Sequence, residues 1–134
     1  MLLDTDILID VALDRLPHSG PASELLDRIE NGSESACIAW HSVSKLYYLV
    51  APARDGTSTR DFIVDLIRFV PVAATDTESV RYAAGPPMID FEDAMQMAAA
   101  QTCGARSIVT RNIVDYERSP IRAVTPQEAL SGLL

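Results

Sequence analysis

Short runs of apolar residues along this chain alternate with stretches in which apolar side chains return every three or four positions. Each short run has a length typical of a buried strand. These runs cover residues 1–3, 36–40, 70–72, 107–110 and 121–124. Pro71 has no N–H to donate, so the third run is expected at a sheet edge. The pattern therefore predicts about five strands.

The stretches between these runs have the spacing of amphipathic helices. The spacing predicts a short first helix that begins near Ile7 and a short last helix that begins with the capping box at Thr125. The helices predicted between them lie at residues 22–29, 43–50, 62–69, 76–84 and 91–103. Asp90 is placed to cap the helix over residues 91–103, and Gly104 is placed to end it. Residues 52–59 are polar and are predicted to be mobile.

Alternating strands and helices are typical of a parallel sheet that is covered by helices on both faces. The length of 134 residues is that of one ordinary domain, so a single domain over residues 1–134 is predicted. In such α/β folds, ligands bind beyond the carboxyl ends of the strands. Asp4 follows the first predicted strand, and residues 112–115 follow the fourth.

Charge and apolar content limit what the protein binds. A net charge of −8 argues against broad, charge-driven binding of nucleic acid. A nuclease is still compatible with it, because carboxylates that hold metal ions make a site acidic. No apolar run approaches the ~18 residues that span a membrane, and no secretory signal is recognisable. We therefore expect a cytoplasmic protein without a membrane partner, in which Cys37 and Cys103 are buried free thiols.

Acidic residues gather where predicted strands end and where a helix begins. Asp4 and Asp6 follow the first strand, Asp90 and Asp93 open a late helix, and residues 112–115 follow the fourth strand. Carboxylates that meet at one sheet edge repel one another, so a cation must neutralise them or a pKa must rise. Mg²⁺ or Mn²⁺ suits oxygen ligands and activates water for phosphodiester hydrolysis. The cluster therefore predicts metal-dependent chemistry on a phosphodiester.

Each acidic residue also has a purely structural interpretation. Asp4 fits the N-cap of the first helix. Asp93 fits the return partner of Asp90 in a capping box, and Asp115 fits an Asx turn. We favour the metal cluster because all three segments share one predicted sheet edge.

Several neighbouring side chains leave two interpretations open. Arg111 is placed to hold a substrate phosphate or to be a solvated surface arginine. His41 is a candidate general base or an incidental residue at a helix start. Trp40, Tyr47 and Tyr48 are candidates for base stacking, but the spacing of Tyr47 and Tyr48 is more typical of a core or a dimer interface.

Four segments, in order along nearly the whole chain, resemble the PIN-domain proteins and in particular the VapC-type toxins. They are LDTDILID at residues 3–10, DFEDA at 90–94, VTRNIVDY at 109–116 and VTPQE at 124–128. The resemblance implies a three-layer α/β/α sandwich around a parallel sheet of about five strands. It also implies a Mg²⁺- or Mn²⁺-dependent endoribonuclease, a homodimer and, for toxin members, neutralisation by a co-encoded antitoxin.

Position by position, the resemblance matches Asp4 and Asp93 to the two core metal-binding aspartates. Asn112 falls where many family members have a fourth acid and others have asparagine. Asp115 belongs to the same motif and is expected to act in catalysis as an outer carboxylate. Two further residues match hydroxyl positions near the metal ions, namely Thr5 and Thr110.

One position departs from the family. Lys45, the only lysine among eleven basic residues, stands in the segment 42–48, where the family usually has a glutamate. Either Lys45 points to solvent and Asp6 or Asp90 substitutes for the missing acid, or its ammonium replaces a metal ion or grips a phosphate. The alternative function is therefore a PIN-like domain that binds RNA or a protein partner with weak or no catalysis.

Two other α/β functions fit less well. A phosphoacceptor receiver domain needs a lysine after its last strand, whereas Lys45 lies in the helix predicted at residues 43–50. A nucleotide-binding domain needs a glycine-rich phosphate loop, and neither Gly-x-Gly-x-x-Gly nor Gly-Lys-Ser/Thr occurs.

Overall fold

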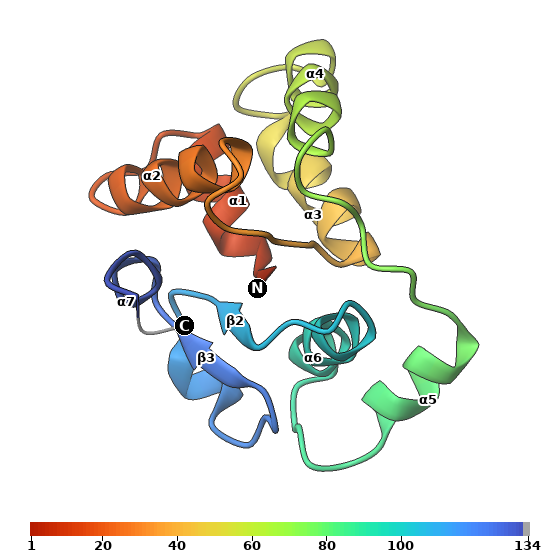
Figure 1. Ribbon diagram of the computed structural model, residues 1–134. Helices are drawn as coiled ribbons and strands as arrows, with labels where there is room; N and C mark the ends of the chain where they lie inside the picture. The colour runs from red at the N-terminus through yellow and green to blue at the C-terminus, as the bar shows by residue number, and fades with distance from the viewer. Residues whose placement is uncertain (133–134) are drawn as a thin grey trace.

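Three short parallel strands lie at the centre of the computed structural model, which describes residues 1–132 (Figure 1). Strand β1 (Leu2–Leu3) pairs with β2 (Ser107–Val109), and β2 pairs with β3 (Arg122–Val124). Both pairings are parallel, and Leu2 lies opposite Ile108. The carboxyl ends of the three strands therefore meet at one edge of the sheet, where the sequence predicts the acidic cluster.

Two of the five predicted strands are present only as single bridges. Cys37 makes a parallel bridge to Leu2, and Ile38 makes one to Val72. Both bridges are parallel, like the pairs of regular strands, so the predicted α/β class is confirmed. The regular strands within the described residues number three rather than the predicted five. The pairing is short because a helix begins soon after Ile38 and because Pro71 has no N–H for a ladder.

The segments between the strands form helices, as predicted. Their bounds are α1 Thr5–Ala12, α2 Ser19–Glu30, α3 Trp40–Val50, α4 Gly56–Leu66, α5 Thr77–Ala84, α6 Phe91–Thr102, the 3₁₀ helix η1 Ile113–Tyr116 and α7 Pro126–Leu130. Residues 52–59, predicted to be a mobile polar segment, include the start of a helix in their second half. There, Asp55 caps α4 by accepting from the Ser58 N–H, and Thr59 is fully buried. Within residues 1–132, every helix is too short or too polar for a transmembrane span.

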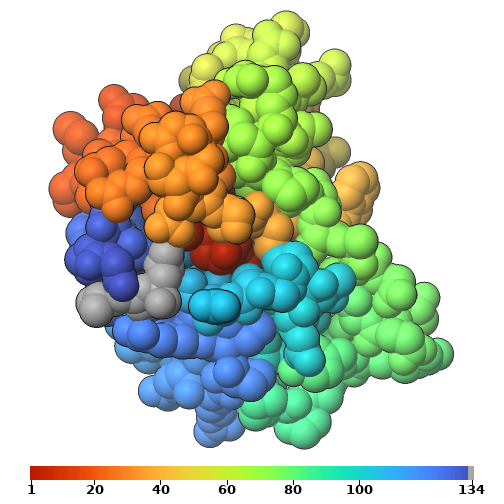
Figure 2. All heavy atoms as spheres, in the orientation of Figure 1, coloured from red at the N-terminus to blue at the C-terminus, as the bar shows by residue number. Residues whose placement is uncertain are grey.

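The sheet is buried on both faces, which gives the predicted three layers. Leu3 and Val109 pack with α1, α2, α3 and α4 in one apolar cluster, whereas Leu2 and Ile108 pack with Met97 of α6 in another. Successive residues of a strand point to opposite faces, so the two residues of β1 contact both helical layers. In Figure 2 the first residues, in red, are almost enclosed by later segments.

Cys37 and Cys103 form a disulfide, so the prediction of free thiols is wrong. Cys37 is buried beside β1, and Cys103 is the C-cap of α6, which packs on the same face of the sheet. Cys103 is also exposed rather than buried. The two cysteines are 66 positions apart in the sequence, and no local signal indicates their contact, because it depends on where α6 packs.

Candidate functional site

A cleft of about 370 Å³ opens at the carboxyl edge of the sheet. Its polar lining comes from four separate segments, which are the β1–α1 junction, α3, the start of α6 and the loop after β2. These residues are Asp4, Thr5, Asp6, Lys45, Asp90, Glu92, Asp93, Asn112 and Asp115. The three acidic segments of the sequence therefore lie around one cleft. Of the other candidate site residues, Thr110 and Arg111 do not line the cleft but donate hydrogen bonds to Asp4 and Asp6.

Asp4 is the most firmly held carboxylate of the cleft. It is 9% exposed and caps α1, with Oδ1 accepting from the Thr5 N–H at 2.7 Å. Oδ2 accepts from the Thr110 hydroxyl at 2.9 Å and from the Tyr116 hydroxyl at 3.0 Å. The capping interpretation of Asp4 is thus correct, and it does not remove the residue from the cleft.

Tyr116 is a site residue that sequence reasoning missed. Its side chain is almost fully buried, and its hydroxyl donates to Asp4. Burial and the nearby Asp4 and Asp93 raise the pKa of the phenol, so it stays a hydrogen-bond donor at neutral pH. The only signal in the sequence is its position beside Asp115 at the end of the 109–116 motif.

Asp6 is held by the loop that follows β2. The Asn112 side-chain amide donates to its Oδ2 at 3.0 Å, and the Arg111 backbone N–H donates to the same atom at 3.3 Å. Its Oδ1 is buried without a hydrogen-bond partner among residues 1–132. Burial first, and then the charge of Asp4, raise the pKa of Asp6 to about 6.

Asp93 lies in the first turn of α6 beside other acids. Asp90 caps this helix, with Oδ1 accepting from the Asp93 N–H at 2.9 Å. Burial first, and then the charges of Asp90, Asp4 and Asp115, raise the pKa of the Asp93 carboxyl to about 6. The negative charge of the acidic side chains in the cleft is therefore not fully balanced by positive charge around them.

Lys45 lies at the rim of this cleft, on α3. Its ammonium forms an ion pair with Glu92 of α6, and the two side chains are 42% and 43% exposed. The hydrogen bond to Glu92 is the main cause that raises the pKa of Lys45. The lysine thus neither points away into solvent nor enters the cleft as a free cation, and its acidic partner is one that sequence reasoning did not single out.

Arg111 is directed to a buried partner rather than to the cleft. Its Nε and a terminal nitrogen donate to the two carboxylate oxygens of Asp10, at 2.6 and 3.3 Å. Asp10 is fully buried and also pairs with Arg15 at 3.1 Å. A bidentate pair of this kind fixes geometry as well as charge. Arg111 therefore anchors the loop that presents Asn112 to Asp6.

A buried hydrogen-bond network below the cleft joins three of its helices. Gln96 of α6 is fully buried, and its amide donates to Thr5 of α1 at 3.1 Å and to Ser42 of α3 at 2.8 Å. The Thr5 hydroxyl also donates to Ser42 at 2.8 Å. The network therefore sets the positions of the helices that carry Asp6, Lys45 and Asp93.

Replacement of Gln96 by leucine is expected to lower the free energy of unfolding by about 1–3 kcal/mol, since it leaves the two buried hydroxyls short of a partner. Urea unfolding measures this change. Gln101→Leu is the matched control, because Gln101 is exposed on the same helix and its substitution is expected to stay within about 0.5 kcal/mol. Equal effects of the two substitutions would contradict a structural role for the network.

The raised pKa values predict how stability depends on pH. Asp6 and Asp93 titrate near pH 6 in the folded protein, against an ordinary value of 3.8, so the folded state binds more protons between these values. Stability from these two groups therefore falls as pH rises from about 4 to about 6. The free energy of unfolding of Asp93→Asn, relative to that of the wild type, should therefore increase as pH rises through this window. Urea unfolding of both metal-free proteins across pH 4–7.5 tests this, and a constant difference would refute it.

The donor set of the cleft fits a hard divalent cation in its chemistry. Its lining offers carboxylate, amide and hydroxyl oxygens, which Mg²⁺ and Mn²⁺ prefer. The partnerless Oδ1 of Asp6 and the raised pKa of Asp93 both indicate uncompensated negative charge. Among residues 1–132, however, no three His, Cys, Asp or Glu side chains stand together as a ready-made metal-binding group.

Three solved structures share this fold. The chain is similar to VapBC2 from Rickettsia felis bound to a promoter DNA fragment, with a TM-score of 0.68, 15% identity and 92% and 96% of the two chains covered. For VapBC-1 of nontypeable Haemophilus influenzae, the TM-score is 0.67, with 14% identity and 94% and 97% covered. For FitAcB of Neisseria gonorrhoeae, the TM-score is 0.63, with 17% identity and 94% and 97% covered.

Sequence comparison identifies the family. Comparison with curated proteins finds no match. The model of the PIN-domain family matches residues 1–114, which include β1, the start of α6 and the loop after β2. This match spans well over half of the chain and every residue that lines the cleft up to Asn112. The chain therefore belongs to the PIN-domain family.

Proposed function

We propose that the protein is a metal-dependent endoribonuclease that hydrolyses RNA phosphodiester bonds as the toxin of a toxin–antitoxin pair. The observation that carries this proposal is the gathering of six carboxylates in one cleft, those of Asp4, Asp6, Asp90, Glu92, Asp93 and Asp115. Close carboxylates with raised pKa values are typical of sites that bind a divalent cation. Membership of the PIN-domain family is consistent with a nuclease.

In this proposal Asp4 and Asp93 hold the ion, Mg²⁺ or Mn²⁺, and Asp115 completes the catalytic acids. When bound, the ion supplies an activated water and stabilises charge on the phosphate. Tyr116 and Thr110 hold Asp4 in position by donating to its Oδ2. Asn112 and Arg111 do the same for Asp6 through its own Oδ2.

Metal binding and cleavage test the proposal together. Mn²⁺ should raise the melting temperature at pH 7.5 by about 5 °C, because a ligand of the folded state stabilises it by mass action. Mn²⁺ should also start cleavage of a single-stranded RNA, and EDTA should reverse both effects. Thermal stabilisation without cleavage would reject the enzyme but retain the metal site.

A non-cleaving PIN-like domain that binds RNA or a protein partner is the second candidate. The ion pair of Lys45 with Glu92 favours it, because a fixed cation beside the cleft opposes the entry of a divalent ion. The absence of both Mn²⁺-dependent stabilisation and Mn²⁺-dependent cleavage would support this candidate.

The partners proposed are a co-encoded antitoxin and a second copy of the chain. Two of the similar structures are of VapBC proteins, from Rickettsia and from Haemophilus. A short neighbouring reading frame whose product co-purifies with this protein and inhibits cleavage would support the antitoxin. Sedimentation equilibrium of the protein alone would give its oligomeric state.

A further inference from the structure

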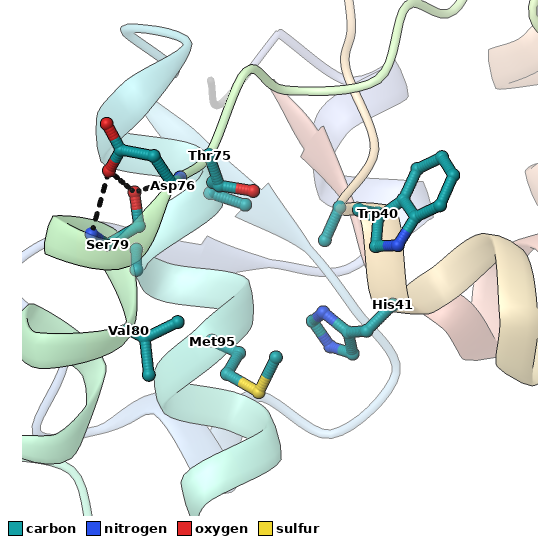
Figure 3. A pocket seen from close by; sticks show the side chains of 10 residues that line it. Trp40, His41, Thr75, Asp76, Ser79, Val80 and Met95 are labelled. Carbon is teal, nitrogen blue, oxygen red and sulfur yellow. Dashed lines mark hydrogen bonds between the residues drawn. The ribbon is translucent and has the colours of Figure 1, made fainter.

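A second pocket, of about 260 Å³, lies beside the carboxylate cleft and is not explained by the proposed chemistry. It is lined by the starts of α3 and α5 and by the middle of α6. Figure 3 shows Trp40 and His41 on one side of the pocket and Val80 on the other, with Met95 beside His41. Three helices thus enclose a space that none of their side chains fills.

The lining of the pocket suits a flat, largely apolar ring. Ala98 and Ala99 of α6 contribute only methyl groups, which leaves room between the bulkier Met95 and Val80. Trp40 lines the same pocket and is 71% exposed, so its indole face is free to stack on a second ring. An exposed aromatic next to a pocket with small side chains is therefore a platform for stacking.

His41 is one of four polar residues that line the pocket, together with Thr75, Asp76 and Ser79. Its Nε2 is buried and has no hydrogen-bond partner among residues 1–132. Burial lowers the pKa of His41, so the ring is neutral at pH 7. His41 therefore contributes a neutral ring to the pocket lining rather than a cation.

The pocket and the cleft share two helices. Along α3, Trp40 and His41 line the pocket and Lys45 lines the cleft. Along α6, Asp93 lines the cleft and Met95 lines the pocket. His41 and Lys45 are four residues apart on α3, so they lie on the same face of this helix. When the backbone of an RNA strand lies in the cleft, a neighbouring nucleotide of the same RNA is therefore close to the pocket.

We propose that this pocket binds an unpaired nucleobase of the RNA strand whose backbone lies in the carboxylate cleft. The inference rests on the proposed RNA substrate and adds where one of its bases is bound. The chain has ten arginines and one lysine, which is paired with Glu92, but its net charge of −8 disfavours affinity that comes from phosphate contacts alone. Stacking on Trp40 supplies affinity that does not depend on positive charge and tolerates any base.

Intrinsic fluorescence tests the proposal directly, because Trp40 is the only tryptophan of the chain. A single-stranded RNA heptamer is titrated into the Asp115→Asn variant in Mg²⁺, which keeps the proposed metal ligands Asp4 and Asp93 and prevents cleavage from competing. The emission of Trp40 should be quenched in a saturable way. A heptamer of the same length without bases should leave the emission unchanged, since it offers phosphates but no ring to stack.

The contribution of Trp40 is measured with two matched variants and a labelled heptamer. Trp40→Ala should weaken binding about tenfold, the effect expected when one stacked base is lost. Tyr48→Ala should leave binding unchanged, because Tyr48 is equally exposed on α3, at 72%, but does not line the pocket. The exposure of both residues means that neither substitution is expected to impair folding.

Three results would overturn the proposal. The first is equal binding of the heptamers with and without bases, and the second is equal binding by the two variants. The third is a change in the oligomeric state of Trp40→Ala, measured as its mass in solution, without a change in RNA binding. That result would show that the pocket is a contact between copies of the chain. If RNA binding depends on Trp40 but Mn²⁺ causes no cleavage, the proposal of base binding in the pocket stands and only the proposal of an enzyme is rejected.

Discussion

Asp93→Asn is expected to reduce Mn²⁺-dependent RNA cleavage at least ~100-fold while leaving the protein folded, since a metal centre contributes several kcal/mol to the transition state. The melting temperature of the metal-free variant should rise at pH 7.5. The reason is that burial, and after it the charges of Asp90, Asp4 and Asp115, disfavour the ionised form of Asp93. Cleavage rates and thermal unfolding with and without Mn²⁺ measure both effects.

The matched control is Asp61→Asn, the same chemical change on the exposed side of α4 outside the cleft. It should change neither cleavage nor the response to Mn²⁺. Asp4→Asn should also abolish cleavage, but it removes an acceptor of Thr110 and Tyr116 and should cost stability, unlike Asp93→Asn. Unchanged cleavage in both site variants would reject the assignment of the metal ligands.

Lys45→Glu is expected to tighten Mn²⁺ binding by about tenfold or more and to raise cleavage. A fixed ammonium about 5 Å from a divalent ion repels it by several kcal/mol at an effective dielectric near 20, and solvent at the rim reduces this figure. The substitution also releases Glu92 from its ion pair and adds a further carboxylate to the cleft. Lys45→Ala, which only releases Glu92, should have a smaller effect in the same direction.

Metal titration and RNA cleavage on the wild type and both Lys45 variants separate the possible roles of the lysine. If the ammonium grips a substrate phosphate, both substitutions should weaken RNA binding and reduce cleavage. Arg81→Glu is the matched control, because Arg81 is an ion-paired cation on α5 outside the cleft. Metal affinity and cleavage that change in neither Lys45 variant would show that the lysine acts only through its surface ion pair.

Local patterns in the sequence were sufficient for the fold class and for the place of the site. The alternation of short apolar runs with helical stripes predicts a parallel sheet between helices, because each pattern is set by the periodicity of one element. Asp4 caps α1 and Asp90 caps α6, so both lie where their own helix begins. Since parallel strands end at one edge, residues that follow β1 and β2 had to approach one another. The same reasoning counted two bridge segments as strands, because apolar runs do not reveal how many residues pair.

Contacts between side chains that are distant in the sequence were decided only by the tertiary structure. Lys45 pairs with Glu92, Arg111 turns to Asp10, and the Tyr116 hydroxyl donates to Asp4. None of these partners follows from the spacing along one helix or strand, because each depends on how two elements are rotated and packed against one another. The Cys37–Cys103 disulfide and the pocket beside Trp40 have the same origin, in the packing of α6 against the sheet and against α3 and α5. The sequence by itself indicated most of the polar residues that line the cleft but not Glu92 or the nearby Tyr116, and packing decided which partner each one faces.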